Sequence, residues 1–211
     1  MSHSPPRVTV DDAIAASSAC SESTNWDMTG FERLFEKGWD INSSLGHVGD
    51  VLSMAVSADK LPAVRFHLDH GADPNANLRG ETYSALELAP IANVGLEIVS
   101  LLLRHGAVAK GRSAMLFAAQ KGRVDMMDMF LDAGVSVDEV PDNDDVYDNA
   151  RAQVDWGTPL HGAAGNGQSE AVMWLLRKGA SRDVKNSIGL TPKEVARQKG
   201  YSDCERLLRT P

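Results

Sequence analysis

The feature that most constrains this sequence is a short segment that recurs along the chain. Each copy is an apolar stretch followed by two polar residues and a glycine, as in Leu101–Ala107 and Trp174–Ala180. The glycines that close the copies are Gly38, Gly71, Gly106, Gly134 and Gly179. Their spacings are 33, 35, 28 and 45 residues. Glycine readily takes the left-handed conformation that ends many helices, so each copy predicts a helix C-terminus.

A second element precedes these glycines by about 20 residues and predicts a helix start. Its clearest form is Thr158–Ala164, which reads Thr-Pro-Leu-His-Gly-Ala-Ala, and a later copy begins at Thr191. Threonine caps a helix and proline suits its first turn. The alanines that follow let two helices pack closely. The repeated unit is therefore a turn, a short helix, a second turn, a second helix, a glycine and a connector.

Together these elements resemble the ankyrin-repeat family, whose period is about 33 residues and whose signature is Thr-Pro-Leu-His-x-Ala. The resemblance covers about residues 11–209 and is strongest at 156–208. It implies an all-α solenoid of helix-turn-helix units with β-hairpin-like fingers. We expect a flexible N-terminus at 1–8 and a repeat domain at 9–211. Its six units are 9–42, 43–75, 76–109, 110–138, 139–183 and 184–211.

Two neighbouring connectors depart from the regular length. From the glycine to the leucine-equivalent position of the next signature, the family has about 14 residues. The distance from Gly106 to Met115 is 9, so this finger is truncated, whereas Gly134 to Leu160 is 26, so the next finger is elongated. A missing finger leaves a notch in the wall of the concave groove. Long connectors are either functional or disordered, and both possibilities stay open for residues 139–156.

The charge of the chain is concentrated in the long connector. The 211 residues hold 29 acidic and 21 basic side chains, a net charge of -8. Residues 139–155 contribute six acids and one arginine, or -5. A net-negative chain is a poor candidate for binding nucleic acid or an anionic membrane surface, because both require clustered lysine and arginine.

Compartment and oligomeric state are predicted from simple absences in the sequence. No apolar stretch suggests a signal peptide, and no run of about 18 apolar residues could span a membrane. Two cysteines, Cys20 and Cys204, are too few for a disulfide framework. We expect a cytoplasmic or nuclear monomer that carries no metal and no cofactor.

Candidate binding residues lie on the irregular fingers and on the groove floor. Trp156 stands where the family places glycine, so its ring would face the groove as an anchor. Gly162 and Gly165 lie within a helix that does not require them, and they either make room for a ligand or finger or reflect drift. The candidates for binding are Trp156, Tyr147, Asp155, Arg112, Gln120, Lys121, Asn166 and Gly162. The resemblance places the floor at Ser57, Ala58, Gln120, Lys121, Gly165, Asn166, Gln198 and Lys199.

The histidines and Trp174 have mainly structural interpretations. The resemblance implies that the ring of His161 joins the backbone of adjacent connectors. His67 and His70 form a His-x-x-His pair, but no third ligand has a matching spacing, so we assign no metal site. His70 and His105 belong to exposed last turns of helices. Trp174 falls at a core leucine position.

Two functions of different class fit these residues. The resemblance implies a non-catalytic module that binds a protein partner in its groove, with the acidic finger 139–155 selecting a basic patch. The alternative is a small-molecule binding protein, or an acid/base enzyme of the isomerase or cyclase kind, with a pocket roofed by 139–156. Asp155, His161, Tyr147 and Asp148 would then act as acid or base. No motif indicates a nucleotide loop, a zinc site or a nucleophile elbow, which favours the first function.

Overall fold

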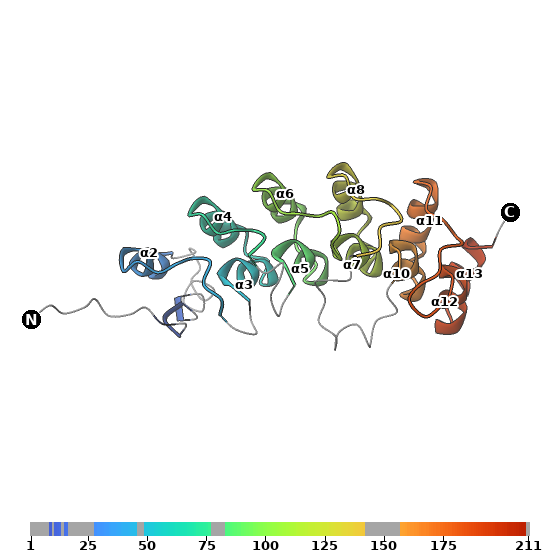
Figure 1. The fold of residues 1–211 in the computed structure, drawn as a ribbon, viewed down its shortest axis with the longest axis horizontal. Helices are drawn as coiled ribbons and strands as arrows, with labels where there is room; N and C mark the ends of the chain where they lie inside the picture. Colours follow the sequence, from blue (N-terminus) through green and yellow to red (C-terminus); the bar gives the residue numbers. More distant parts are fainter. Residues whose placement is uncertain are drawn as a thin grey trace, which may run out of the picture.

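The computed structural model describes residues 9, 11–13, 15–16, 28–45, 49–76, 83–141 and 157–209. Within these residues all regular structure is helical, and Figure 1 shows α4, α6, α8 and α11 above a row of α3, α5, α7 and α10. The inner helices are α3 (Val51–Ser57), α5 (Ala85–Ile91), α7 (Ala114–Lys121), α10 (Pro159–Gly165) and α12 (Pro192–Lys199). The outer helices are α2 (Thr29–Glu36), α4 (Leu61–Asp69), α6 (Leu96–Arg104), α8 (Val124–Asp132), α11 (Ser169–Arg177) and α13 (Ser202–Leu207). The predicted all-α solenoid is confirmed.

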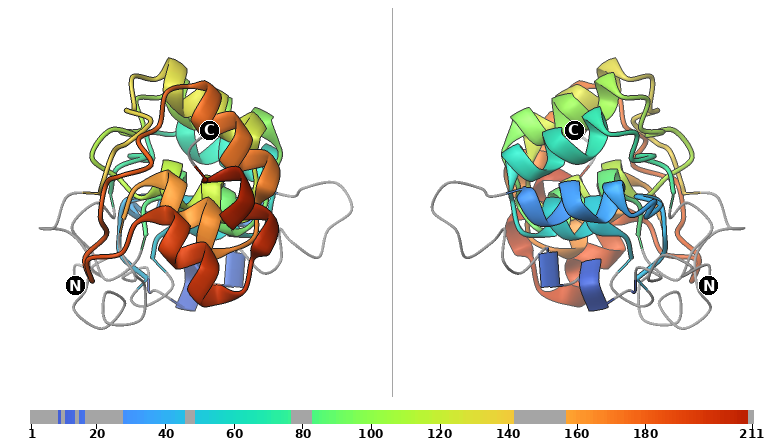
Figure 2. Two further views of the ribbon diagram at one scale, coloured as in Figure 1. Left: turned by 90° about the vertical axis from the view of Figure 1, so that its right-hand side faces the viewer. Right: turned by 90° about the vertical axis from the view of Figure 1, so that its left-hand side faces the viewer.

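Each inner helix packs on the next inner helix, and each outer helix from α4 onward packs on the next outer helix. Helix α2 contacts α4 through the rings of Phe35 and Phe66. Seen along the stack in Figure 2, the two rows superpose as two layers with the connectors on one side. The buried side chains between the layers are mainly alanine, valine, leucine and methionine. Trp174 is 4% exposed, so its predicted core position is confirmed. The core is therefore one continuous strip along the stack.

The helix ends follow from local sequence. The five glycines of the recurring segment have φ between 75° and 90°, so the predicted left-handed helix ends are confirmed. At the other end, side chains cap the first turn of the inner helices: Asp50 accepts a hydrogen bond from Ser53 N, and capping boxes join Ser84 to Glu87 and Thr191 to Glu194. These caps fix where each inner helix begins and where its first buried side chain points.

Cross-repeat hydrogen bonds hold successive connectors together, with one gap. Asn75 Nδ2 donates to Gly106 O at 2.9 Å, and Val108 N donates to Asn75 Oδ1 at 2.9 Å. Asn42 makes the equivalent pair of bonds with the following unit. In the next unit this place is taken by Lys110, at the start of the short connector. The pair of hydrogen bonds from an asparagine is therefore missing where the connector is truncated.

Candidate functional site

The predicted floor is a set of eight residues at the ends of the inner helices, most of them polar. Gln120 and Gly165 are half-buried, and the other six members are exposed: Ser57, Ala58, Lys121, Asn166, Gln198 and Lys199. They come from the C-terminal ends of α3, α7, α10 and α12, so the stacking of the repeats sets them in one row. We call these eight residues together the inner surface. Asn166 Nδ2 donates to Gly162 O at 2.9 Å, which orients its amide on that surface.

Gly162 faces the neighbouring helix. A Cβ atom at Gly162 would lie 2.7 Å from Leu116 Cδ1 and 3.2 Å from Leu116 O of α7. A Cβ atom at Gly165 would lie 3.0 Å from Val195 Cγ1 of α12. Both glycines therefore allow α10 to approach its two neighbours closely. The space beside Gly162 is occupied by protein, and its predicted role in binding stays a prediction.

His161 joins α10 to the following connector. Thr158 N donates to His161 Nδ1 at 3.1 Å, so the ring proton is on Nε2, which donates to Leu190 O at 3.0 Å. The side chain is 2% exposed, and this burial lowers the pKa of His161 below its usual value. The ring is thus neutral and fully engaged with the backbone, as the resemblance implied.

Glu87 performs the same task between α5 and α7, and the sequence analysis missed it. Its side chain is 7% exposed. Oε2 accepts from Ser84 N at 3.0 Å and from Ser84 Oγ at 2.8 Å, while Oε1 accepts from Ser113 N at 3.0 Å. The capping pattern Ser84-x-x-Glu87, followed by a shortened connector, is the signal that could have revealed it.

The short and long connectors meet where the long one begins. Gly111 N donates to Glu139 Oε1 at 2.5 Å, and Ser136 N donates to Glu139 Oε2 at 3.2 Å. Arg112 lies next to this contact and is half-buried. Glu139 is the first acid of the 139–155 connector, so one of its six carboxylates is tied to the truncated finger. The predicted contact between Arg112 and an acid stays a prediction.

The remaining predicted site residues are outside the described part of the chain. Trp156, Tyr147, Asp155 and Asp148 belong to the segment 142–156, and only its flanking residues, Pro141 and Gly157, are described, both of them buried. Both possibilities for this segment, a roof over the groove and a disordered connector, therefore stay open.

His67 and His70 occupy different environments in spite of their spacing. His67 is 1% exposed, and its Nδ1 has no hydrogen-bond partner among the described residues. Burial, with a contribution from nearby His70, lowers the pKa of His67 to about 4. His70 is exposed at the end of α4. Its ring stacks on Phe35 at 5.3 Å and contacts Phe66 in a tilted arrangement at 4.0 Å between centroids. Among the described residues, no three His, Cys, Asp or Glu side chains are grouped to hold a metal.

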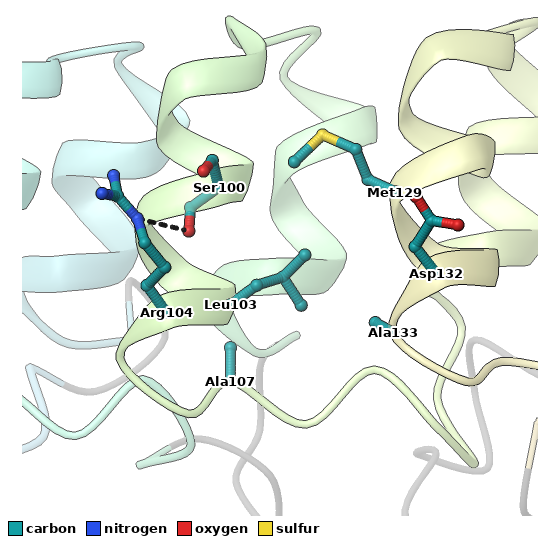
Figure 3. A pocket seen from close by; sticks show the side chains of 7 residues that line it. All are labelled: Ser100, Leu103, Arg104, Ala107, Met129, Asp132 and Ala133. Carbon is teal, nitrogen blue, oxygen red and sulfur yellow. Dashed lines mark hydrogen bonds between the residues drawn. The ribbon is translucent and has the colours of Figure 1, made fainter.

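A surface hollow lies on the outer row, on a different side of the stack from the inner surface. It lies between α6 and α8 and has a volume of about 520 Å³. Figure 3 shows the side chains that line it: the apolar Leu103, Ala107, Met129 and Ala133, and the polar Ser100, Arg104 and Asp132. We call it the outer groove. The sequence analysis did not predict it, because it depends on side chains that face each other across two helices.

Two family profiles match the repeated architecture. Ankyrin repeats (3 copies) matches residues 52–141, and Ankyrin repeats (many copies) matches residues 115–176. The chain belongs to the ankyrin-repeat family. Ankyrin repeats generally mediate protein–protein interaction, so the functional region expected in this chain is a binding surface.

Curated relatives share the repeats but are much longer. The chain is 31% identical over 147 residues to the B-cell lymphoma 3 protein homolog of Mus musculus, covering 66% of this chain and 30% of the relative. It is 28% identical over 193 residues to Protein glp-1 of Caenorhabditis elegans, covering 84% and 14%. It is 29% identical over 178 residues to Palmitoyltransferase ZDHHC13 of Homo sapiens, covering 82% and 26%. The chain thus spans less than a third of each.

The helices of the ankyrin stack are short. Within the described ranges, none reaches the length and apolar character that crossing a bilayer requires.

Proposed function

We propose that this ankyrin-repeat chain is a non-catalytic module that binds a protein partner along the inner surface. The observation that carries the proposal is the row of exposed polar side chains on successive inner helices, including Lys121, Asn166 and Lys199. Their backbones are rigidly held by buried helices, so little conformational entropy is lost when they contact a partner. A stack of repeats also supplies contact area in proportion to its length.

The buried polar groups favour binding over catalysis. Glu87 and His161 use their polar atoms to join one repeat to the next, and the Asp50 carboxylate caps α3. A general acid or base must be able to reach a substrate. Engaged in this way, these three buried titratable side chains serve the stack and are not presented to a ligand.

The acidic finger 139–155 is proposed to add specificity. It concentrates a charge of -5 next to the inner surface in sequence, and a partner with a basic patch would be favoured by that charge. The interaction would be strongest at low ionic strength, because exposed charges are screened within about 10 Å at 0.1 M salt.

The enzymatic alternative depends on Asp155, Tyr147 and Asp148, together with a closed cavity under the finger. No observation on the described residues favours it over partner binding. It is kept as an outcome of the test below.

The proposal is tested by site-specific photo-crosslinking. A benzoylphenylalanine placed at Asn166 is expected to crosslink one cellular protein, which is then purified and measured by calorimetry. The matched control places the same group at Met173, which is 40% exposed on the outer helix α11. The substitution Lys121→Glu is expected to weaken binding about tenfold, as for a central contact residue. Replacing Asp142, Asp144, Asp145, Asp148 and Asp155 by asparagine should weaken it further and reduce its salt dependence.

Two results would count against the proposal. One is equal crosslinking from Asn166 and Met173. The other is an unchanged affinity in Lys121→Glu, combined with a metabolite that raises the melting temperature of the wild type but not of Trp156→Ala. The second result would move the function to a small-molecule site.

A further inference from the structure

Neighbouring outer helices contact each other at equivalent places along the stack. At two of these places, side chains of the two helices interact directly. Between α8 and α11, Lys178 Nζ lies 3.3 Å from Asp128 Oδ1 and 5.1 Å from the centroid of the Trp174 ring. Between α2 and α4, the Phe35 ring stacks on the rings of Phe66 and His70. In both places side chains of the two neighbouring outer helices contact each other directly.

At the equivalent place between α6 and α8 the bridging residues are replaced by small ones. Counted back from the glycine that ends each outer helix, Ser100 stands where α8 has Asp128, and Ala133 stands where α11 has Lys178. Neither serine nor alanine is long enough to cross the space between two helices. The outer groove between α6 and α8 (Figure 3) therefore lacks the salt bridge that joins α8 to α11.

The rim of the outer groove carries one charge of each sign. Arg104 Nε donates to Ser100 O of its own helix at 3.3 Å, and the ends of its guanidinium remain at the surface (Figure 3). Asp132 is exposed on the opposite helix and makes no ion pair with any described residue. Between them lie Leu103 and Met129, and methionine adapts its shape to varied apolar side chains.

A second hollow extends the outer groove over α6. It has a volume of about 430 Å³ and shares Ser100, Arg104 and Met129 with the first. It adds Arg65 of α4 and the exposed Leu96 and Glu97 of α6. On this side of the outer groove the two arginines, Arg65 and Arg104, outnumber the one acid, Glu97, whereas Asp132 is the acid on the α8 side. This asymmetry of charge determines the direction in which a charged segment would bind.

We propose that the outer groove binds a short segment of a second protein partner, which inserts one long apolar side chain between α6 and α8. An acidic residue of the segment pairs with Arg104 and Arg65, and a basic residue pairs with Asp132. The site is independent of the inner surface, so the chain would hold two partners at once and act as a bridge between them. Affinity comes from the buried apolar side chain, and the direction of binding comes from the two charges.

The experiment uses a random 12-residue peptide library displayed on phage, selected on the full chain. Counter-selection uses the variant Ser100→Asp with Ala133→Lys, which builds into the outer groove the salt bridge that the chain itself uses between α8 and α11. Enriched peptides are synthesised with a fluorescent label and measured by anisotropy. We expect them to carry an apolar residue between an acid and a base. We expect about tenfold weaker binding to the counter-selection variant and to Arg104→Glu. Binding to Lys121→Glu, on the inner surface, should be unchanged.

A charge exchange makes the direction of binding testable. The double variant Arg104→Glu with Asp132→Arg should prefer a peptide whose acidic and basic residues have been exchanged. The proposal is overturned by an absence of enrichment, or by peptides whose affinity ignores Ser100→Asp with Ala133→Lys. It is also overturned if sedimentation shows a wild-type dimer that this variant abolishes, because the occupant would then be a second copy of the chain. Since Lys121→Glu tests the inner surface separately, either proposal can fail alone.

Discussion

The contact between α5 and α7 and the contact between α10 and α12 use side chains of opposite chemistry at the same place in the repeat. In the first, the Glu87 carboxylate accepts a hydrogen bond from Ser113 N. In the second, the His161 ring donates one to Leu190 O. The connector before α12 has the regular length, whereas the connector before α7 is five residues shorter. The backbone therefore presents a carbonyl at one contact and an N–H group at the other, and the side chain matches it.

Of the substitutions at these contacts, Glu87→Ala should reduce the stability of the protein most. It removes three hydrogen bonds to a buried carboxylate and leaves Ser113 N without its acceptor. We expect the free energy of unfolding in urea to fall by about 3–5 kcal/mol. Glu97→Ala, on the exposed surface of α6, should change it by less than about 0.5 kcal/mol. Equal effects of the two substitutions would show that Glu87 does not join the repeats.

Acid should weaken the contacts that depend on buried histidine. The pKa of His67 is lowered to about 4 from 6.5, so between these values the unfolded chain binds more protons than the folded chain. The stabilisation is complete above pH 6.5, and about 3 kcal/mol is lost as the pH falls to 4. The lowered pKa of His161 acts in the same direction.

The variant His67→Leu separates the two histidines. Leucine occupies the equivalent place in α6 and α11, at Leu102 and Leu175, so the variant should fold. Urea unfolding between pH 7 and pH 4 is expected to show a smaller loss of stability in this variant than in the wild type, and the remainder would include the part due to His161. Identical pH profiles would contradict the assignment.

The smallest effect on stability is expected where α10 packs on α7. This contact is close because Gly162 has no side chain. Gly162→Ala would bring a Cβ atom to 3.2 Å from the backbone oxygen of Leu116, and the expected cost is about 1–2 kcal/mol after the gain in helix propensity. Gly165→Ala meets only the end of the Val195 side chain, at 3.0 Å, and should be nearly neutral. Thermal unfolding compares the two variants. A more damaging Gly165→Ala would reverse this interpretation of the α10 contacts.

The sequence predicted those parts of the fold that depend on periodicity and local caps. The left-handed glycines and the core position of Trp174 follow from the phase of the repeat, and the backbone contact of His161 follows from the resemblance to the family. Glu87 was missed because its acceptor role appears only when the shortened connector places Ser113 N beside it. The environment of Gly162 was not predictable from one helix, because it depends on which neighbour approaches which side.

The candidate site was predicted in part for the same reason. The exposed ends of the inner helices follow from the repeat, so Lys121, Asn166 and Lys199 could be named from the sequence. The outer groove depends on Ser100 and Ala133 being small at the same time on two different helices. That the two small residues face each other is visible only in the structure, where α6 and α8 lie side by side.

The pairing of Glu87 with a short connector also affects how the repeats of this chain can be rearranged. A unit ending in a regular connector could not be moved behind α5, because its backbone carbonyl would then face the Glu87 carboxylate. A duplication or deletion at this boundary must therefore carry Glu87 and residues 105–113 together. The contacts between neighbouring repeats therefore depend on the order of the repeats, although each repeat has the same architecture.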